Sequence, residues 1–293
     1  MTTLHIITGP TAVGKTEAAL EWAEKNKAEI LSCDSVCVYR GMNIGSAKPT
    51  LAQQKRVPHY GIDLVEPTQR FSVAQFISYA QSAIREIQTK GKSVCITGGS
   101  GFYLAAFFGP VTDELPISEA VIEEVRALQK SGADALRQRL HELEGPTLPS
   151  WLDQSNPIRL AKALERRLSS PLSLDALRDE FLTKKGPFAD YRFSCELLER
   201  PDDELKARIH LRTDEMLRSG LVTEAESLLK LGLDPELPSV RAVGYRETMD
   251  WIRNGRETPI KALSEHICLN TWALVKKQRK WFRRLGIATG PVE

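Results

Sequence analysis

The sequence predicts an α/β fold, in which a parallel sheet is covered by helices and the chain carries a helical insertion. Three β-rich runs indicate the sheet: LHIIT at 4–8, EILSC at 29–33 and KSVCITGG at 92–99. Helical patterns separate them, one from Thr16 onward and one between Ser72 and about Lys90. The order βαβαβ favours parallel strands, because each crossover helix returns the chain to the same end of the sheet.

The elements have recognisable ends. Ser72 and Gln75 form a capping-box pattern that predicts the start of the second helix. The run RFSCELLE at 192–199 predicts a return strand, and helices are expected after it. Thr258 and Pro259 are the expected N-cap and first residue of the last long helix.

Three segments are expected along the chain. Residues 116–190 hold almost only helical periodicity, broken by GPTLPSW and by Ser-Ser-Pro near 170. We therefore expect a first core segment at 1–115, a helical insertion at 116–190, and a return strand with C-terminal helices at 191–293.

Composition excludes several classes of protein. A formal charge of +2 is too balanced to argue for a nucleic-acid partner from the total alone. The start lacks the pattern of a signal peptide, and no stretch approaches a membrane span, so a cytoplasmic protein is expected. The five cysteines are scattered and fit reduced thiols, and no repeat or apolar stripe specifies an oligomer, so we expect a monomer.

The sharpest motif follows the first strand and satisfies G-x-x-x-x-G-K-[ST]. Its residues are expected to bind a diphosphate: Gly9, Pro10, Thr11, Ala12, Val13, Gly14, Lys15 and Thr16. Backbone N–H groups and the helix N-terminus attract phosphate, Lys15 adds a charge, and Thr16 can bind Mg²⁺. The sheet is therefore expected to be P-loop NTPase-like, and ATP, GTP or a non-nucleotide diphosphate would each fit.

Two further segments belong to the expected ligand edge of the sheet. Asp34 directly follows the run ILSC, where parallel sheets place their ligands. It is a candidate metal-linked carboxylate or general base, and a turn residue paired with Ser35 is the alternative. The run from Gly98 to Gly101 allows close backbone approach to a ligand, although such loops are common.

Two helices carry basic faces. Arg159, Lys162 and Arg166 recur at helical spacing after Asn156-Pro157. The last helix holds six cations around Trp281 and Phe282, a combination that suits RNA phosphates and bases. A solvated helix face is the alternative for both. These cations are Lys276, Lys277, Arg279, Lys280, Arg283 and Arg284.

The ordered motifs resemble the tRNA dimethylallyltransferase family over nearly the whole chain. The matching segments are GPTAVGKT at 9–16, DSVCVYRGMNIGSAKP at 34–49, VPHYGID at 57–63, GGSGFY at 98–103, NPIRLAKALE at 156–165, SVRAVGYRE at 239–247 and KKQRKWFRR at 276–284. The chain differs from the usual residues at Cys37, where glutamine is frequent, and at Trp272, which replaces an arginine.

The resemblance implies transfer of a dimethylallyl group from dimethylallyl diphosphate to the adenosine 3′-adjacent to the anticodon in tRNA. The diphosphate would enter from the phosphate-loop side and a flipped adenosine from the other. Asp34 would take a proton from the exocyclic amine, giving isopentenyladenosine and pyrophosphate. Lys15, Thr16, Mg²⁺ and Arg241 would stabilise the leaving group, with Ser100 near the channel.

The same resemblance implies two tRNA-contacting segments, with the insertion gripping the anticodon stem. They are Asp34, Ser35, Val36 and Cys37 with Ser100, and Arg159, Leu160, Ala161, Lys162 and Ala163. Three other functions stay open: a small-molecule kinase, a prenyltransferase acting on free adenylate, and a non-catalytic RNA-binding P-loop protein. A kinase would place an acidic residue after the third strand, where this chain has Gly98 and Gly99.

Overall fold

The computed structural model describes residues 2–112, 115–233, 235 and 237–287. The chain divides into two compact units, Met1–Val111 with Gly186–Glu293, and Thr112–Lys185. The second unit is the helical insertion, against the limits 116–190 expected from the sequence. We describe each unit by itself.

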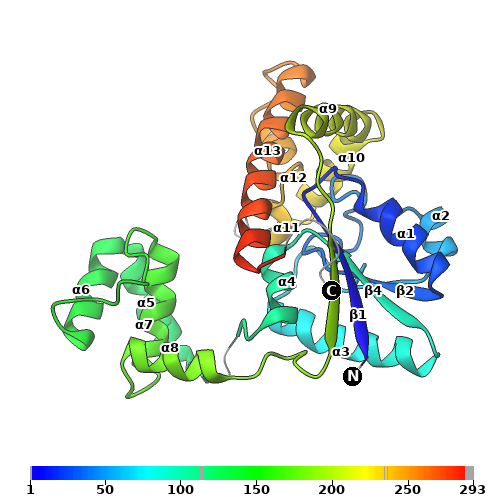
Figure 1. Cartoon of the computed structure of the whole chain (residues 1–293). Coiled ribbons are helices and arrows are strands. Elements are labelled where there is room, and N and C mark those ends of the chain that lie inside the picture. The colour runs from blue at the N-terminus through cyan, green and yellow to red at the C-terminus, as the bar shows by residue number, and fades with distance from the viewer. Residues whose placement is uncertain (1, 113–114, 234, 236, 288–293) are drawn as a thin grey trace. The chain divides into compact units, whose positions relative to one another are not determined.

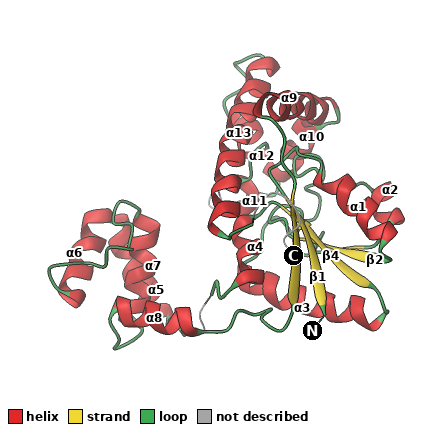
Figure 2. Cartoon of the chain, in the orientation of Figure 1, coloured by secondary structure: helices red, strands yellow, loops and turns green. Residues whose placement is uncertain are grey.

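The first unit is built on a five-stranded parallel sheet (Figure 2), as the βαβαβ order predicted. The strand order is β3-β2-β4-β1-β5, so the strand before the phosphate loop lies between two partners. The return strand pairs with β1 from Thr3↔Arg192 to Thr8↔Leu197. The strands are β1 Thr3–Thr8, β2 Ala28–Ser32, β3 His59–Tyr60, β4 Ser93–Gly98 and β5 Arg192–Leu197.

Sequence patterns gave no indication of β3. The strand contains only His59 and Tyr60, which pair with Ile30 and Leu31. Two residues are too few to show an alternation of apolar and polar side chains. The strand depends on its neighbour in the sheet rather than on a local pattern.

Apolar side chains alternate between the two faces of the sheet. Ile7 packs toward α1, Lys15–Lys25, whereas Leu4 and Ile6 pack toward α3, Val73–Thr89, and α4, Gly101–Phe108. The predicted capping box at the start of α3 is confirmed, with Ser72 and Gln75 each bonded to the other's backbone. Helices therefore cover both faces of the sheet.

The C-terminal helices pack beyond the carboxyl ends of the strands (Figure 1), around two further apolar clusters. One cluster joins Val13 of the phosphate loop to Leu205, Ile209 and Val275. The last helix begins at Ile260 with Pro259 as N-cap, one residue later than predicted, because the backbone of Pro259 is still extended. The helices are α9 Asp202–Arg218, α10 Leu221–Leu229, α11 Pro238–Arg241, α12 Tyr245–Arg253 and α13 Ile260–Arg284; the short α2, Leu51–Arg56, precedes β3.

The insertion unit is a small helical bundle with its own core. Leu136, Leu140, Leu160 and Leu164 are fully buried in it. Asn156 caps the third helix by accepting N–H bonds from Ile158 and Arg159, with Pro157 in the first turn, as the sequence predicted. The helices are α5 Glu119–Lys130, α6 Ala133–Glu144, α7 Pro157–Leu168 and α8 Leu174–Thr183.

Two expectations from composition can be compared with the coordinates. Across the described ranges, none of the helices is both long enough and apolar enough to cross a membrane. The cysteines at 33, 37, 95, 195 and 268 are all buried and free of disulfides.

Candidate functional site

The loop between β1 and α1 has positive φ angles at three positions, two of which are glycines. Gly9 and Gly14 have φ angles of 154° and 110°, and Ala12 has 64°. A Cβ atom on Gly9 would lie 2.5 Å from the carbonyl oxygen of Leu198, which follows β5. The loop is therefore shaped by the return strand as well as by its own sequence.

Three arginines hold the outer side of this loop. Arg200 Nε donates to the carbonyl of Val13 at 2.8 Å, and Arg208 Nε of α9 donates to that of Ala12 at 2.7 Å. One turn further along α9, Arg212 Nη1 lies 3.2 Å from Thr11 Oγ1. These bonds hold the loop through two carbonyl oxygens and Thr11, and they place the guanidinium groups of Arg208 and Arg212 in the cavity wall.

Lys15 is buried close to a second cation, Arg212. Its Nζ donates to the carbonyls of Gly9 and Pro10 at 2.9 and 2.8 Å. Burial, and then the nearby Arg212, lower the pKa of Lys15 to about 8, although Asp34 opposes this shift. Burial likewise lowers the pKa of Arg212, again opposed by Asp34. Such a site gains most from a multivalent anion.

Asp34 is held by a turn of its own loop. Its Oδ1 accepts N–H bonds from Val36 and Cys37 at 2.8 and 3.3 Å, not from Ser35 as the turn alternative supposed. Within the described part of the chain Oδ2 has no hydrogen-bond partner. Asp34 lines the cavity, so the carboxylate is both a turn residue and available to a ligand.

Ser100 supports this loop from behind. Its Oγ accepts the backbone N–H of Ser35 at 2.9 Å and donates to Ser35 Oγ at 3.1 Å. Neither serine is among the cavity-lining residues, whereas Val36 and Cys37 are. Ser100 therefore positions the Asp34 loop rather than facing a ligand.

A carboxylate from α10 anchors the next part of the same segment. Glu224 accepts backbone N–H bonds from Asn43, Ile44 and Gly45 at 2.9 to 3.2 Å, and the Tyr245 hydroxyl at 2.5 Å. A Cβ on Gly45 would lie 2.7 Å from the Tyr245 ring, so this approach requires glycine. The contact explains why the segments 34–49 and 239–247 occur together.

Lys48 fixes that segment from within. Its buried Nζ donates to the carbonyl of Tyr39 at 2.7 Å, to Asn43 Oδ1 at 3.0 Å and to Asp63 Oδ1 at 2.6 Å. The ammonium is thus fully partnered, as a buried charge must be. Lys48 therefore links the segment 34–49 to Asp63, the last residue of the segment 57–63.

Gln278 of α13 links the two glycine-bearing loops. Its Oε1 accepts the N–H of Thr11 at 2.9 Å, and its Nε2 donates to the carbonyl of Gly99 at 3.0 Å. At the neighbouring Gly98, a Cβ would lie 2.1 Å from the carbonyl oxygen of Cys33. No acidic side chain can occupy this strand end, where a kinase would need one.

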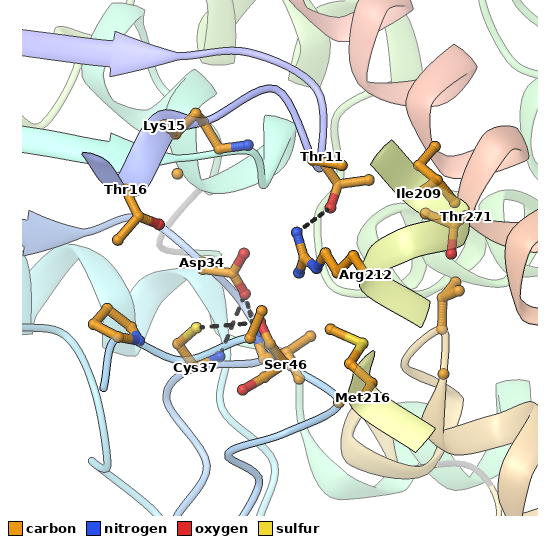
Figure 3. A pocket seen from close by; sticks show the side chains of 18 of the residues that line it. Thr11, Lys15, Thr16, Asp34, Cys37, Ser46, Ile209, Arg212, Met216 and Thr271 are labelled. Atoms are coloured by element: carbon orange, nitrogen blue, oxygen red, sulfur yellow. Dashed lines mark hydrogen bonds between the residues drawn. The ribbon is translucent and has the colours of Figure 1, made fainter. Parts of the chain in front are cut away.

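These elements enclose a cavity of about 580 Å³ within the first unit. Figure 3 shows Asp34 between Thr16 and Arg212, with Lys15 of the phosphate loop nearby and Ile209, Thr271 and Met216 beyond Arg212. The cavity therefore has a charged part at the phosphate loop and an apolar part between α9 and α13. Apolar residues line the cavity from α9 (Ile209, Leu211 and Met216), from α13 (Ile267 and Leu274) and from the segments that hold Val36, Ala47, Pro49 and Val243.

Other predicted site residues lie elsewhere. Arg241, at the end of α11, is not among the residues that line the cavity. Arg159 and Lys162 belong to the insertion unit, are exposed, and pair with Asp153 at 3.3 Å and Glu165 at 2.6 Å. Leu160, Ala161 and Ala163 form part of the core of that unit, so their side chains cannot reach a partner from these positions.

The two departures from the usual family residues are placed differently. Cys37 lines the cavity, and burial raises the pKa of its thiol, which keeps it protonated. Trp272 lies outside the lining, with Lys206 Nζ 4.9 Å and the Arg279 guanidinium carbon 5.8 Å from its ring centre. Only Cys37 changes the cavity itself.

Sequence reasoning missed five residues that build the site: Arg200, Arg208, Arg212, Glu224 and Gln278. The i, i+4 spacing of the two arginines on one helix was a usable signal, because it places both on the same face. Glu224 and Gln278 bind backbone groups of residues 179 or more positions away, and no local pattern reports such contacts.

A comparison with known protein families identifies the family of this chain. A family model described as "IPP transferase" matches residues 37–285. The chain belongs to the IPP transferase family. The phosphate loop at 9–16 lies before the matched range.

Relatives of the IPP transferase chain agree with this assignment. A tRNA dimethylallyltransferase from Opitutus terrae is 46% identical over 280 residues, covering 96% of this chain and 89% of the relative. The crystal structure of a tRNA isopentenylpyrophosphate transferase from Bacillus halodurans has a TM-score of 0.67 at 31% identity, covering 99% of this chain and 89% of that chain. A eukaryotic dimethylallyltransferase acting on tRNA has a TM-score of 0.81 at 21% identity, covering 96% and 70%, and shows the common fold.

Proposed function

We propose that this protein transfers a dimethylallyl group from dimethylallyl diphosphate to the exocyclic amine of the adenosine 3′-adjacent to the anticodon in tRNA. One observation carries the proposal beyond family membership: a single cavity joins a diphosphate-binding loop, a carboxylate and an apolar wall. The charged part suits the diphosphate and the apolar part suits an isoprenoid chain.

The reaction follows from the arrangement of charges. The adenosine nitrogen attacks the allylic carbon, the carbon–oxygen bond to the diphosphate breaks, and pyrophosphate leaves. Asp34 accepts the proton lost by the amine. Lys15 and Arg212 lie where negative charge develops on the leaving oxygens, and they favour the transition state over the ground state.

We further propose that Mg²⁺ binds with the diphosphate. Thr16 and Asp34 offer hard oxygen ligands beside each other in the cavity, and the buried Thr97 Oγ1, which also lines it, has no hydrogen-bond partner. The described residues contain no cluster of three metal-ligating side chains. Mg²⁺ fits such a site, since it commonly keeps several waters and takes phosphate oxygens as ligands. It would neutralise charge on the leaving group.

The alternatives fit less well. The crowding at Gly98 disfavours a kinase that needs an acidic residue there. A prenyltransferase for free adenylate leaves the exposed cations Arg159 and Lys162 without a role. The intact set of Lys15, Thr16 and Asp34 at one cavity disfavours a non-catalytic binding module. We propose that the protein acts in the cytoplasm as a monomer.

The test incubates purified protein with unmodified tRNA, Mg²⁺ and dimethylallyl diphosphate, with ATP replacing the prenyl donor in a parallel reaction. Mass analysis of the digested nucleosides should show isopentenyladenosine only with the prenyl donor, and less of it after chelation of the metal. Tight tRNA binding without product would support the non-catalytic alternative instead.

A further inference from the structure

One face of α13 continues past the edge of the cavity. Ile267, Thr271, Leu274 and Gln278 line the cavity at helical spacing. Trp281 follows Leu274 by seven residues and Gln278 by three, so it lies on the same face, one turn beyond the last lining residue. A ligand extending out of the cavity along this helix would meet Trp281 next.

Trp281 forms an aromatic pair with Phe102 of α4. Their ring centroids are 6.2 Å apart, with the planes tilted by 50°. The Phe102 side chain is exposed, at 46% for the residue, although it is a large apolar group. A Cβ on Gly101 would lie 2.3 Å from Trp281 Cγ, so only glycine lets the indole approach the start of α4. Glycine at position 101 therefore allows the Trp281 ring to lie against the residue that follows Ser100.

Cations without acidic partners surround this aromatic pair. The Arg284 guanidinium lies over the Trp281 ring at 5.4 Å, and Lys277 lies one turn earlier on the same face. Both are exposed, and neither makes an ion pair within the described part of the chain. Arg279, on another face, is paired with Glu199 and Asp202. The charge beside Trp281 is therefore available to a polyanion.

We propose that Phe102, Trp281, Lys277 and Arg284 form a stacking platform for an unpaired tRNA nucleotide next to the one whose base occupies the cavity. The proposal rests on the tRNA-modifying function above. Flipping a base into the cavity leaves its neighbour without a stacking partner. The exposed Phe102, backed by the half-buried Trp281 one turn along α13 from the lining residue Gln278, replaces that partner, and the cations hold the adjoining phosphates.

The experiment measures RNA binding to the full-length protein, using an anticodon stem-loop hairpin and the same hairpin with an abasic site at either neighbour of the target adenosine. Phe102→Ala should weaken binding of the intact hairpin by roughly tenfold, as expected for one lost base–aromatic stack. The loss should disappear on the hairpin that lacks the stacked neighbour. Arg284→Ala should weaken both hairpins and reduce the salt dependence of binding.

Phe108→Ala is the matched control, because it removes the same residue type from the same helix at 38% exposure. It should leave both hairpins unaffected. A 2-aminopurine at the stacked position should lose its bound-state quenching in Phe102→Ala and keep it in Phe108→Ala. Calorimetric binding of dimethylallyl diphosphate to each variant confirms that the core remains folded.

Unchanged affinity of Phe102→Ala, or an equal loss on intact and abasic hairpins, would overturn the platform. Failure of the proposed function is distinguishable, since it would appear as absence of isopentenyladenosine with the unaltered protein. The platform is measured by binding and fluorescence, independently of product.

Discussion

At Asp34, one carboxylate oxygen is engaged by the turn and the other faces the cavity. Asp34→Asn keeps an acceptor for the turn but cannot take a proton. We expect it to lower the prenyl-transfer rate by roughly 10² to 10⁴, the usual contribution of a general base, with tRNA affinity nearly unchanged. Single-turnover kinetics and filter binding measure the two quantities. An active Asp34→Asn variant would remove Asp34 as the base.

The pKa of Lys15, lowered to about 8, makes binding of the prenyl donor pH-dependent. Below that pH the ammonium is present. Above it a proton must be taken up before the diphosphate gains its partner, so affinity should fall by up to about tenfold per pH unit. Calorimetry in two buffers of different ionisation enthalpy should show proton uptake near pH 8. Lys15→Arg stays charged and should show a flat profile; uptake in that variant would point to another group.

Substitutions of Arg212 and Arg241 distinguish which of the two arginines stabilises the leaving pyrophosphate. Arg212 lines the cavity beside the phosphate loop, whereas Arg241 does not line it. Because Arg212 lies beside the phosphate loop that we propose binds the leaving pyrophosphate, Arg212→Ala should lower the transfer rate by roughly 100-fold. Arg241→Ala should have a much smaller effect under the same rapid-quench assay. The reverse order would return the pyrophosphate role to Arg241, as the family resemblance implied.

At the scale of secondary-structure elements, the sequence predicted those elements whose pattern lies within a short stretch of the chain. The strands β1, β2, β4 and β5, the phosphate loop and the caps of α3 and α7 each carry a recognisable pattern within a few consecutive residues, and they were predicted. The strand β3 and the contacts of Glu224 and Gln278 were not. Each depends on a partner brought close only by the completed sheet, so a one-dimensional pattern carries no signal for it.

The segment 34–49 is an element without regular secondary structure, and its shape depends on Glu224. Glu224→Ala leaves three N–H groups without their acceptor, which should cost about 1–3 kcal/mol of stability. Because the segment carries Asp34, the transfer rate should fall more than the affinity for dimethylallyl diphosphate. Thermal unfolding, single-turnover kinetics and calorimetry measure the three effects.

Glu226→Gln is the control for that experiment. It lies two residues away on the same helix and pairs with Arg256 rather than with the segment. It should retain the transfer rate. Similar losses in both variants would mean that α10 as a whole, and not its contact with the segment, is responsible.

At the scale of the whole molecule, the exposed cations of α7 are expected to serve RNA binding. Arg159→Ala with Lys162→Ala should weaken tRNA binding and reduce the slope of log affinity against log salt by about 1.5, as for two lost phosphate contacts. Lys130→Ala with Lys185→Ala removes two other exposed cations of the same unit and should have less effect. Equal slopes in both double variants would exclude a special role for α7.

The chain leaves and re-enters the core at neighbouring points, since a Cβ on Gly186 would lie 2.9 Å from Gly109 Cα. The insertion therefore begins and ends at neighbouring points of the core, between α4 and β5, and the order of strands in the sheet does not depend on its length. Such an arrangement lets the helical insertion be exchanged, enlarged or shortened without a change in the path of the core. The insertion unit and the cavity of the first unit can therefore change independently of each other.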